Sequence, residues 1–134
     1  MMNNIVIIEK EPTVEEYIKL RNSIGWNILE HEKIKKGLNN SIYCVCVEEN
    51  GNIVGFGRII GDGGTAFYIQ DIMVNPSCQK QKIGTLIMEK IMDYINSNCT
   101  EGAIIGLIAK SGLDNFYKKF GFTYNQDNRF YRYK

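Results

Sequence analysis

The residues with the clearest chemical potential lie in the segment PSCQKQKIGTLI, residues 76–87. Lys80 and Lys82 alternate there with Gln79 and Gln81, just before an apolar helical pattern begins. A helix N-terminus leaves amide groups without intrahelical acceptors, and the helix dipole adds partial positive charge. Cationic and amide side chains at this place, with no acid among them, predict a site for an anion such as a pyrophosphate. The other interpretation, a solvated basic loop, stays open at this point.

Other ligand-binding motifs are missing from the sequence. It has no Gly-Lys-Ser or Gly-Lys-Thr of a P-loop and no GxGxxG of a dinucleotide site. The four cysteines form no CxxC pair and His31 is the single histidine, so we expect no metal site. Cys44 and Cys46 alternate in a strand-like run and are expected to be buried. Cys78, in the polar loop, is expected to be exposed.

Length and composition predict one globular domain over residues 1–134. Hydrophobic residues make up 44% and charged residues 23%, which are ordinary globular values. A net charge of +1 gives no basic field for nucleic acid. The N-terminus has no signal-peptide pattern, and no apolar stretch approaches the roughly 18 residues of a membrane span. We therefore expect a cytoplasmic protein with reduced cysteines.

Hydrophobic periodicity predicts elements in the order β-α-α-β-β-β-α-β-α-β-β. The first helix opens with a capping box, Thr13-x-x-Glu16, and is expected to end near Gly25. A second helix is expected to be closed by Gly37 and Asn39. The predicted strands are 4–10, 41–48, 53–60, 66–74, 103–108, 122–124 and 130–133, and the later helices are 83–95 and 113–120.

This order predicts an α+β domain, with a mixed sheet and helices on both faces. Asn50-Gly51 supplies a hairpin turn between two of the strands. The continuous apolar run 103–108 predicts a strand that is buried on both faces and parallel to 66–74. The helix between these two strands starts at their carboxyl ends, which is where open sheets bind ligands.

Two segments resemble the GNAT superfamily of N-acetyltransferases. The segment DIMVNPSCQKQKIGTLIMEKI resembles its central motif, Gln/Arg-x-x-Gly-x-Gly/Ala after a strand that ends in Val-x-Pro, with Gln79 opening the motif and Gly84 closing it. The segment NFYKKFGF, residues 115–122, resembles the later signature Phe-Tyr-x-x-x-Gly-Phe. The order of elements matches the fold over nearly the whole chain. Lys82 replaces the first glycine of the motif, and its side chain either crowds a bound phosphate or points outward as an added cation.

The resemblance implies acetyl-CoA as cosubstrate and no metal. The pyrophosphate would lie on the polar loop, and the pantetheine would pair with the preceding strand end like an extra strand. The family's usual oxyanion donor is a backbone amide at that strand end, here Met73 or Val74. The residues implied for acetyl-CoA are Ile72, Met73, Val74, Gln79, Lys80, Gln81, Lys82, Ile83, Gly84, Thr85 and Asn115.

Two residues are candidates for proton transfer. Tyr117 matches the family tyrosine that protonates the leaving thiolate, and a phenol with a reference pKa near 10 is protonated at pH 7. A packing aromatic is the alternative for this residue. Asp71 is the candidate base, taking a proton from the amine through water, and a structural hydrogen bonder is its alternative.

The resemblance also implies a primary amine of a small molecule as acceptor, attacking the thioester directly in a ternary complex. The first two helices and their connection would form its pocket. Trp26 either lines that pocket or anchors the core, and Tyr133 would close it from the other side. The alternatives are a non-catalytic CoA-binding sensor, a peptide or protein N-terminal acetyltransferase, and a purely structural interaction domain. A homodimer through the C-terminal strands stays an open expectation.

Overall fold

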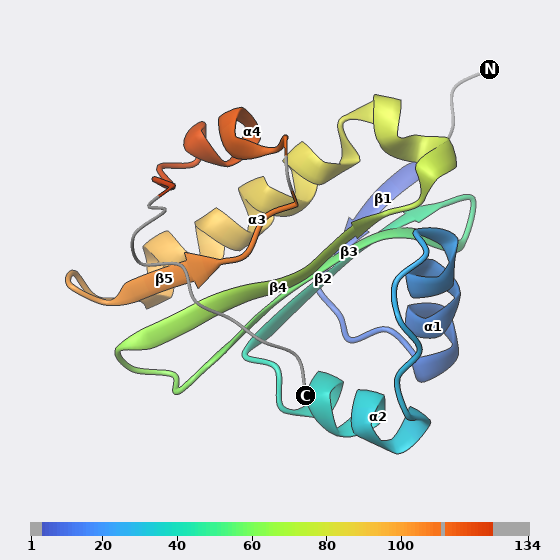
Figure 1. Ribbon diagram of the computed structural model, residues 1–134, viewed down its shortest axis with the longest axis horizontal. Coiled ribbons are helices and arrows are strands. Elements are labelled where there is room, and N and C mark those ends of the chain that lie inside the picture. Colours follow the sequence, from blue (N-terminus) through green and yellow to red (C-terminus); the bar gives the residue numbers. More distant parts are fainter. Residues whose placement is uncertain (1–3, 111, 125–134) are drawn as a thin grey trace.

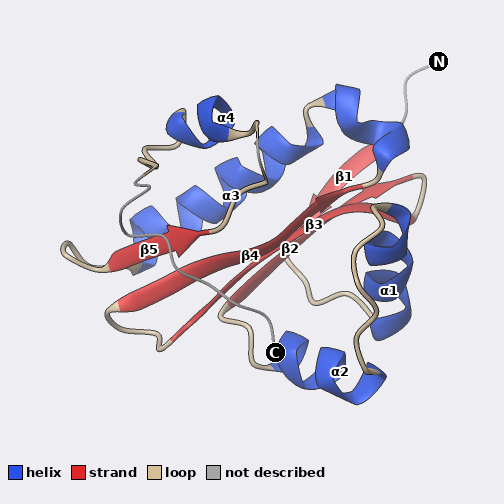
Figure 2. Cartoon of the chain, in the orientation of Figure 1, coloured by secondary structure: helices blue, strands red, loops and turns tan. Residues whose placement is uncertain are grey.

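The computed structural model describes residues 4–110 and 112–124. They form a five-stranded sheet in the order β1-β2-β3-β4-β5, with helices on both faces (Figure 1, Figure 2). Neighbouring strands are antiparallel except β5, which runs parallel to β4. The elements are β1 (Ile5–Ile8), α1 (Val14–Ser23), α2 (His31–Asn39), β2 (Tyr43–Glu49), β3 (Asn52–Gly61), β4 (Ala66–Val74), the 3-10 helix η1 (Pro76–Gln81), α3 (Ile83–Asn98), β5 (Ile104–Leu107) and α4 (Asp114–Lys118). The predicted α+β class and mixed sheet are confirmed.

The sheet carries a hydrophobic core on each face. Val45, Val47 and Ile59 pack against α3, whereas Cys46 and Phe56 pack against α1 and α2. Adjacent residues of β2 thus serve opposite cores, as the period of two in a strand requires. Cys46 is buried as predicted, and Cys44 is half-buried. Figure 1 shows α3 and α4 on one side of the sheet and α1 and α2 on the other.

The ends of α1 and α2 are set by local hydrogen bonds. The capping box of α1 is present, with the Glu16 amide donating to the Thr13 hydroxyl and the Thr13 amide donating to the Glu16 carboxylate. The prediction that Gly37 helps to close α2 was wrong, because the helix continues through it to Asn39. Glycine at an internal helical position costs only about 1 kcal/mol relative to alanine. The packing of the neighbouring residues therefore decides where the helix ends.

The prediction of a fully buried fifth strand was also wrong. Ile105 and Leu107 of β5 pack toward α3, but Ile104 and Ile108 on the other side are 69% and 52% exposed. Figure 1 shows the reason within the described part of the chain, since α1 and α2 cover the middle of the sheet and not β5. The parallel pairing of β5 with β4 is confirmed.

The strand predicted at 122–124 is not formed. The Phe122 amide donates to the Tyr117 carbonyl and the Gly121 amide donates to the Lys118 carbonyl, with Gly121 at φ +89°. These two bonds close α4 in a Schellman motif, and the Phe122 ring packs against Tyr117 as that motif prefers. The Phe122 amide therefore caps a helix and takes no part in a sheet. The predicted strand 130–133 lies outside the described residues.

Two glycines in β3 bring the first half of α3 close to the sheet. A Cβ on Gly57 would lie 2.7 Å from both Ile72 Cδ1 and Ile87 Cγ2, and a Cβ on Gly55 would lie 2.7 Å from Ile83 Cγ2. Real Cβ atoms do not approach other atoms so closely. The two positions thus set the height of the helix N-terminus above β3 and β4.

We predict that Gly57→Ala lowers the free energy of unfolding by about 1–3 kcal/mol, the usual cost of overpacking a core. Gly106→Ala is the matched control, because its Cβ would meet Tyr68 at an ordinary 3.7 Å within another strand. Urea unfolding followed by circular dichroism measures both. Equal stability of the two variants would contradict this account of how α3 is placed.

Candidate active site

A bulge interrupts β4 near its carboxyl end. The register pairs Arg58 with Gln70 and Phe56 with Met73, so Asp71 and Ile72 both lie opposite the single residue Gly57. Asp71 has φ +59°, in the left-handed region that residues other than glycine rarely adopt. One extra residue in one strand, in this conformation, is a β-bulge.

The bulge reverses which face each later side chain of β4 occupies. Before it, Phe67 and Ile69 pack into the core beneath α3. After it, Ile72 and Val74 take that face, and Met73 packs into the core with α1. Without the extra residue, every side chain after Gln70 would point to the opposite face, because a shift of one residue exchanges the two faces.

The bulge also coincides with the point where β4 and β5 part. Their parallel pairing ends at Ile69 and Leu107. The Asn75 amide donates to the Val54 carbonyl, so the antiparallel alternation turns the amide and carbonyl of Val74 away from β3. By the same alternation Met73 faces β3 and Ile72 faces away from it. The end of β4 therefore presents backbone groups of Ile72 and Val74 along an edge that β5 does not pair.

The N-terminus of α3 lies directly after this edge. The helix begins at Ile83, preceded by η1, and has no acidic residue in its first turn. The Leu86 amide donates to the Lys82 carbonyl, so the amides of Ile83, Gly84 and Thr85 are those without an intrahelical acceptor. The predicted anion-binding loop thus has the backbone geometry that such a site needs.

Lys82 occupies the junction between η1 and α3. Its backbone is left-handed, with φ +60° and ψ +27°, and the residue is exposed. This conformation costs a side-chain-bearing residue about 1–2 kcal/mol and costs glycine nothing. The chain therefore keeps the backbone shape that favours glycine at this motif position while adding an exposed cation.

The other residues of the polar loop differ in how exposed they are. Gln79 is exposed, and its amide nitrogen lies 3.4 Å from the Val74 carbonyl oxygen. The prediction that Cys78 is exposed was wrong, since only 3% of it is accessible and it packs into the core beneath α3. The turns of η1 fold it inward. The side chains of Lys80 and Gln81 lie outside the described part of the structure.

Helix α4 brings Tyr117 to the same side of the sheet as α3 (Figure 1). A Cβ on Gly84 would lie 3.6 Å from the Phe116 ring and 3.9 Å from Val74, so α4, the start of α3 and the end of β4 meet. Tyr117 is buried beside the Phe116 ring, and burial raises the pKa of its phenol above the ordinary value. No hydrogen bond of its hydroxyl is found among the described residues. Asn115 is exposed on α4.

The Asp71 side chain is the centre of a buried polar network on the opposite face of the sheet. Its side chain is 0% exposed. One carboxylate oxygen accepts from the Tyr17 hydroxyl at 2.7 Å and from Arg58 Nε at 2.9 Å. The other accepts from Gln70 Nε2 at 3.2 Å and lies 3.7 Å from Arg21 Nη1. Both oxygens are therefore already engaged.

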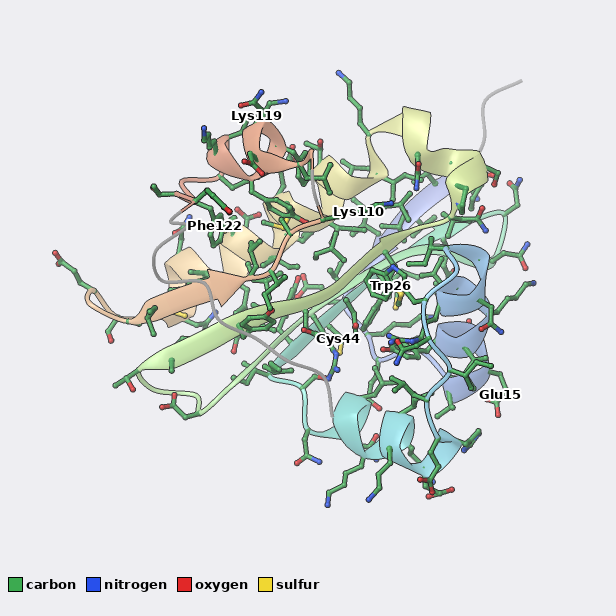
Figure 3. All side chains as sticks on the ribbon, in the orientation of Figure 1. Glu15, Trp26, Cys44, Lys110, Lys119 and Phe122 are labelled. Atoms are coloured by element: carbon green, nitrogen blue, oxygen red, sulfur yellow. The ribbon has the colours of Figure 1, made fainter. Side chains whose placement is uncertain are left out.

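The network extends from Asp71 to the connection between α1 and α2. Arg21 Nη1 donates to the Tyr17 hydroxyl, and the same guanidinium binds the carbonyl and side-chain oxygens of Asn27 at 2.8 and 2.6 Å. The Trp26 ring lies over this guanidinium, with 5.3 Å between the guanidinium carbon and the ring centroid. Trp26 is 39% exposed and is labelled on the connection in Figure 3. It is not a core anchor, so its role as a wall of a pocket stays a prediction.

Sequence reasoning missed the partners of Asp71. No role is assigned to Tyr17 and Arg21 from the sequence, although their spacing of four places them together on one face of α1. The signal for the bulge was present in Gln70-Asp71, two polar residues in succession inside an apolar strand. The predicted Tyr133 lies outside the described residues. Glu30, His31 and Glu32, where α2 begins, are exposed.

Two hollows of about 220 and 290 Å³ lie away from this site. They share Glu9 and Tyr43, and the first is also lined by Tyr94 and Asn98 from the second half of α3. Neither touches the end of β4 or the polar loop. The described ranges hold no group of side chains able to bind a metal and no helix of the length and apolarity that crossing a bilayer requires.

Known proteins resemble this chain in sequence and in fold. Residues 39–124 match the model of the acetyltransferase (GNAT) domain family. An uncharacterized N-acetyltransferase of Pyropia yezoensis is 28% identical over 122 residues, which are 88% of this chain and 69% of that protein. A probable acetyltransferase of unknown function from meticillin-resistant Staphylococcus aureus is 38% identical, with a TM-score of 0.90 over 98% of both chains.

A more distant relative in fold was solved with CoA bound. An aminoglycoside N-acetyltransferase solved in complex with CoA shares the fold, with a TM-score of 0.72, 14% identity, and coverage of 100% of this chain and 97% of the other. The family model spans most of the sheet, the polar loop and α4, and so covers the β4 bulge, the α3 N-terminus and Tyr117 together. The chain therefore belongs to the GNAT acetyltransferase family.

Proposed function

We propose that the protein transfers an acetyl group from acetyl-CoA to a primary amine of a small molecule, by direct attack within a ternary complex. The observation that carries the proposal is the meeting of three features at one place. The unpaired edge of β4 ends at the α3 N-terminus, and α4 meets both through Phe116, whose ring packs against the buried Tyr117. Each feature supplies one requirement of thioester aminolysis.

The binding of acetyl-CoA follows from the first two features. The pyrophosphate lies on the free amides of Ile83, Gly84 and Thr85, where the helix dipole and the Lys82 cation favour an anion. The pantetheine pairs with the edge presented by Ile72 and Val74, as a strand added to a sheet. The fold shared with the CoA-bound aminoglycoside N-acetyltransferase supports this assignment.

The oxyanion of the tetrahedral intermediate needs a backbone donor at this edge. The predicted donors were Met73 and Val74. The register turns the Met73 amide toward β3, whereas those of Ile72 and Val74 face the open edge. We therefore assign the role to the Ile72 or Val74 amide and no longer to Met73.

The chemical step forms a nitrogen–carbon bond and breaks the carbon–sulfur bond. The amine loses a proton to water, and the departing thiolate takes the proton of the Tyr117 hydroxyl, which solvent then restores. Because burial raises the pKa of Tyr117, the phenol stays protonated at neutral pH and can donate its proton to the thiolate. Asp71 was the predicted base. Both of its oxygens already accept hydrogen bonds, so we propose a positioning role for it instead.

The acceptor approaches from the connection between α1 and α2, where Trp26 offers an exposed aromatic face. A small amine is the proposed class, with Tyr133 as a second wall. We also retain the cytoplasm as the proposed compartment, because Cys44, Cys46, Cys78 and Cys99 are all free thiols. The homodimer remains a proposal that rests on the family alone.

We predict that Lys82→Glu weakens acetyl-CoA binding by about tenfold, because it reverses the charge beside the phosphate amides. Lys90→Glu makes the same change on the same helix, about 12 Å further along at 1.5 Å per residue, and is expected to leave affinity nearly unchanged. Lys82→Gly keeps the left-handed backbone and is expected to stay within about threefold of the wild type. Isothermal titration calorimetry measures all four proteins. No heat from the wild type at millimolar acetyl-CoA would overturn the proposed function.

We predict that Tyr117→Phe lowers kcat by about 100-fold and changes KM for acetyl-CoA by less than about twofold, as loss of a general acid should. Tyr94→Phe is the control, since that ring stacks on Tyr43 away from the site. Thiol release is measured with arylalkylamines, amino sugars, polyamines and peptides as acceptors. Turnover of peptides alone would favour an N-terminal acetyltransferase. Binding of acetyl-CoA with no turnover of any amine would favour the CoA-binding sensor.

A further inference from the structure

We propose that Tyr17 and Arg58 are positioning residues for acetyl transfer, because their hydrogen bonds to Asp71 hold the β4 bulge that aims a backbone amide at the thioester. This inference rests on the proposed function and goes beyond it, since neither residue belongs to the family motifs described above.

The bulge conformation is costly without its side-chain contacts. Asp71 holds φ +59° inside a strand, which costs a side-chain-bearing residue about 1–2 kcal/mol. The opposing residue, Gly57, has no side chain with which to brace the bulge. The contacts that offset this cost are those of the Asp71 carboxylate, with its 2.7 Å bond from Tyr17 and its 2.9 Å bond from Arg58.

Both partners are themselves fixed. Tyr17 is 3% exposed, packs edge-on against Phe56 and accepts from Arg21. Arg58 Nη1 donates to the Gly37 carbonyl and to the Ser41 hydroxyl, at 3.0 and 3.1 Å. The carboxylate is therefore attached to α1, to the end of α2 and to β3 at once. Burial and the nearby carboxylate raise the pKa of Tyr17 to about 12, so its hydroxyl remains a donor at any pH of catalysis.

The position of the bulge decides in which direction the backbone amides of Ile72 and Val74 point. If the left-handed residue relaxed toward an extended conformation, the backbone after it would rotate, and its amides would turn away from the open edge. The cores on both faces resist a full change of register, because Met73 and Ile72 are packed into them. A small loosening is sufficient for an effect, since a displacement of about 1 Å in a catalytic group can cost about 100-fold in rate.

A positioning role predicts a particular kinetic signature. Tyr17→Phe removes one hydrogen bond to Asp71 and preserves the ring that packs on Phe56. We expect kcat to fall by about tenfold or more. We expect the Kd for CoA to rise by less than about threefold, because the pantetheine shares the displaced edge of Ile72 and Val74, whereas the amides of α3 that hold the pyrophosphate lie beyond the bulge. The Ile72 and Val74 amide resonances are expected to shift in ¹⁵N–¹H spectra of the CoA complex.

The control is Tyr43→Phe, because Tyr43 is also a buried tyrosine whose pKa is raised to about 12, and it packs into the core beneath α3. Its kcat is expected to equal that of the wild type. A lower Tm for Tyr17→Phe with unchanged kcat, measured well below both transitions, would mean that the contact is only structural and would overturn the proposal.

A series at position 71 separates positioning from proton transfer. Asn and Gly tolerate the left-handed region better than Ala does, and Asn keeps one acceptor oxygen. Positioning predicts that kcat falls in the order Asp71→Asn, Asp71→Gly, Asp71→Ala, with Asn the mildest. A base predicts equal losses in all three and the disappearance of the acidic limb of the pH–rate profile, which would overturn the assignment.

Failure of this inference is distinguishable from failure of the proposed function. Wild-type turnover with an unaltered kcat in Tyr17→Phe removes the positioning role and leaves the acetyltransferase. A wild-type protein that binds no CoA and acetylates no amine removes both. A matching loss of kcat in Tyr17→Phe and Arg58→Lys, with CoA still bound, supports both.

Discussion

The hydrogen bonds to the Asp71 carboxylate are the interaction on which, in our proposal, the arrangement of the candidate site depends. The carboxylate lies at the one residue of β4 with a left-handed backbone, and its hydrogen bonds reach α1 and β3. The bulge at this residue exchanges the faces of all later side chains in the strand, so both cores depend on it. It also marks where β4 separates from β5, which leaves an edge free for a ligand. One polar group thus links the stability of the sheet to the shape of the site.

The charges around Asp71 do not form a simple ion pair. The guanidinium groups of Arg21 and Arg58 both face the carboxylate of Asp71. Burying these charges is favourable only where hydrogen bonds replace the solvation that the charged groups lose. The structure provides these bonds through backbone carbonyls, since Arg21 donates to Asn27 and Arg58 donates to Gly37. Each arginine therefore connects the carboxylate to a different segment. The network stabilises the relative placement of α1, α2 and the sheet more than any one contact in it.

The polar loop illustrates how a motif position is set by backbone conformation. Lys82 has the left-handed backbone conformation that glycine adopts most easily, which explains why glycine suits this motif position. The residues that follow Lys82 form the start of α3, as the resemblance implied. The glycines of β3 then bring that helix end down to the sheet, next to the free edge of β4. The proposed anion site and the proposed pantetheine edge lie next to each other because β3 lacks side chains at Gly55 and Gly57.

The sequence alone determined the local elements and the family. The capping box at Thr13, the Asn50-Gly51 turn and the period of α3 are local signals, and the structure has all of them because short-range sterics and hydrogen bonds set them. Only the tertiary structure decided the role of Asp71. Its partners lie 13 and 54 residues away in the chain, and no local pattern states which donors will surround a buried carboxylate. The exposure of Ile104 and the burial of Cys78 were decided in the same way, by which helices cover which part of the sheet.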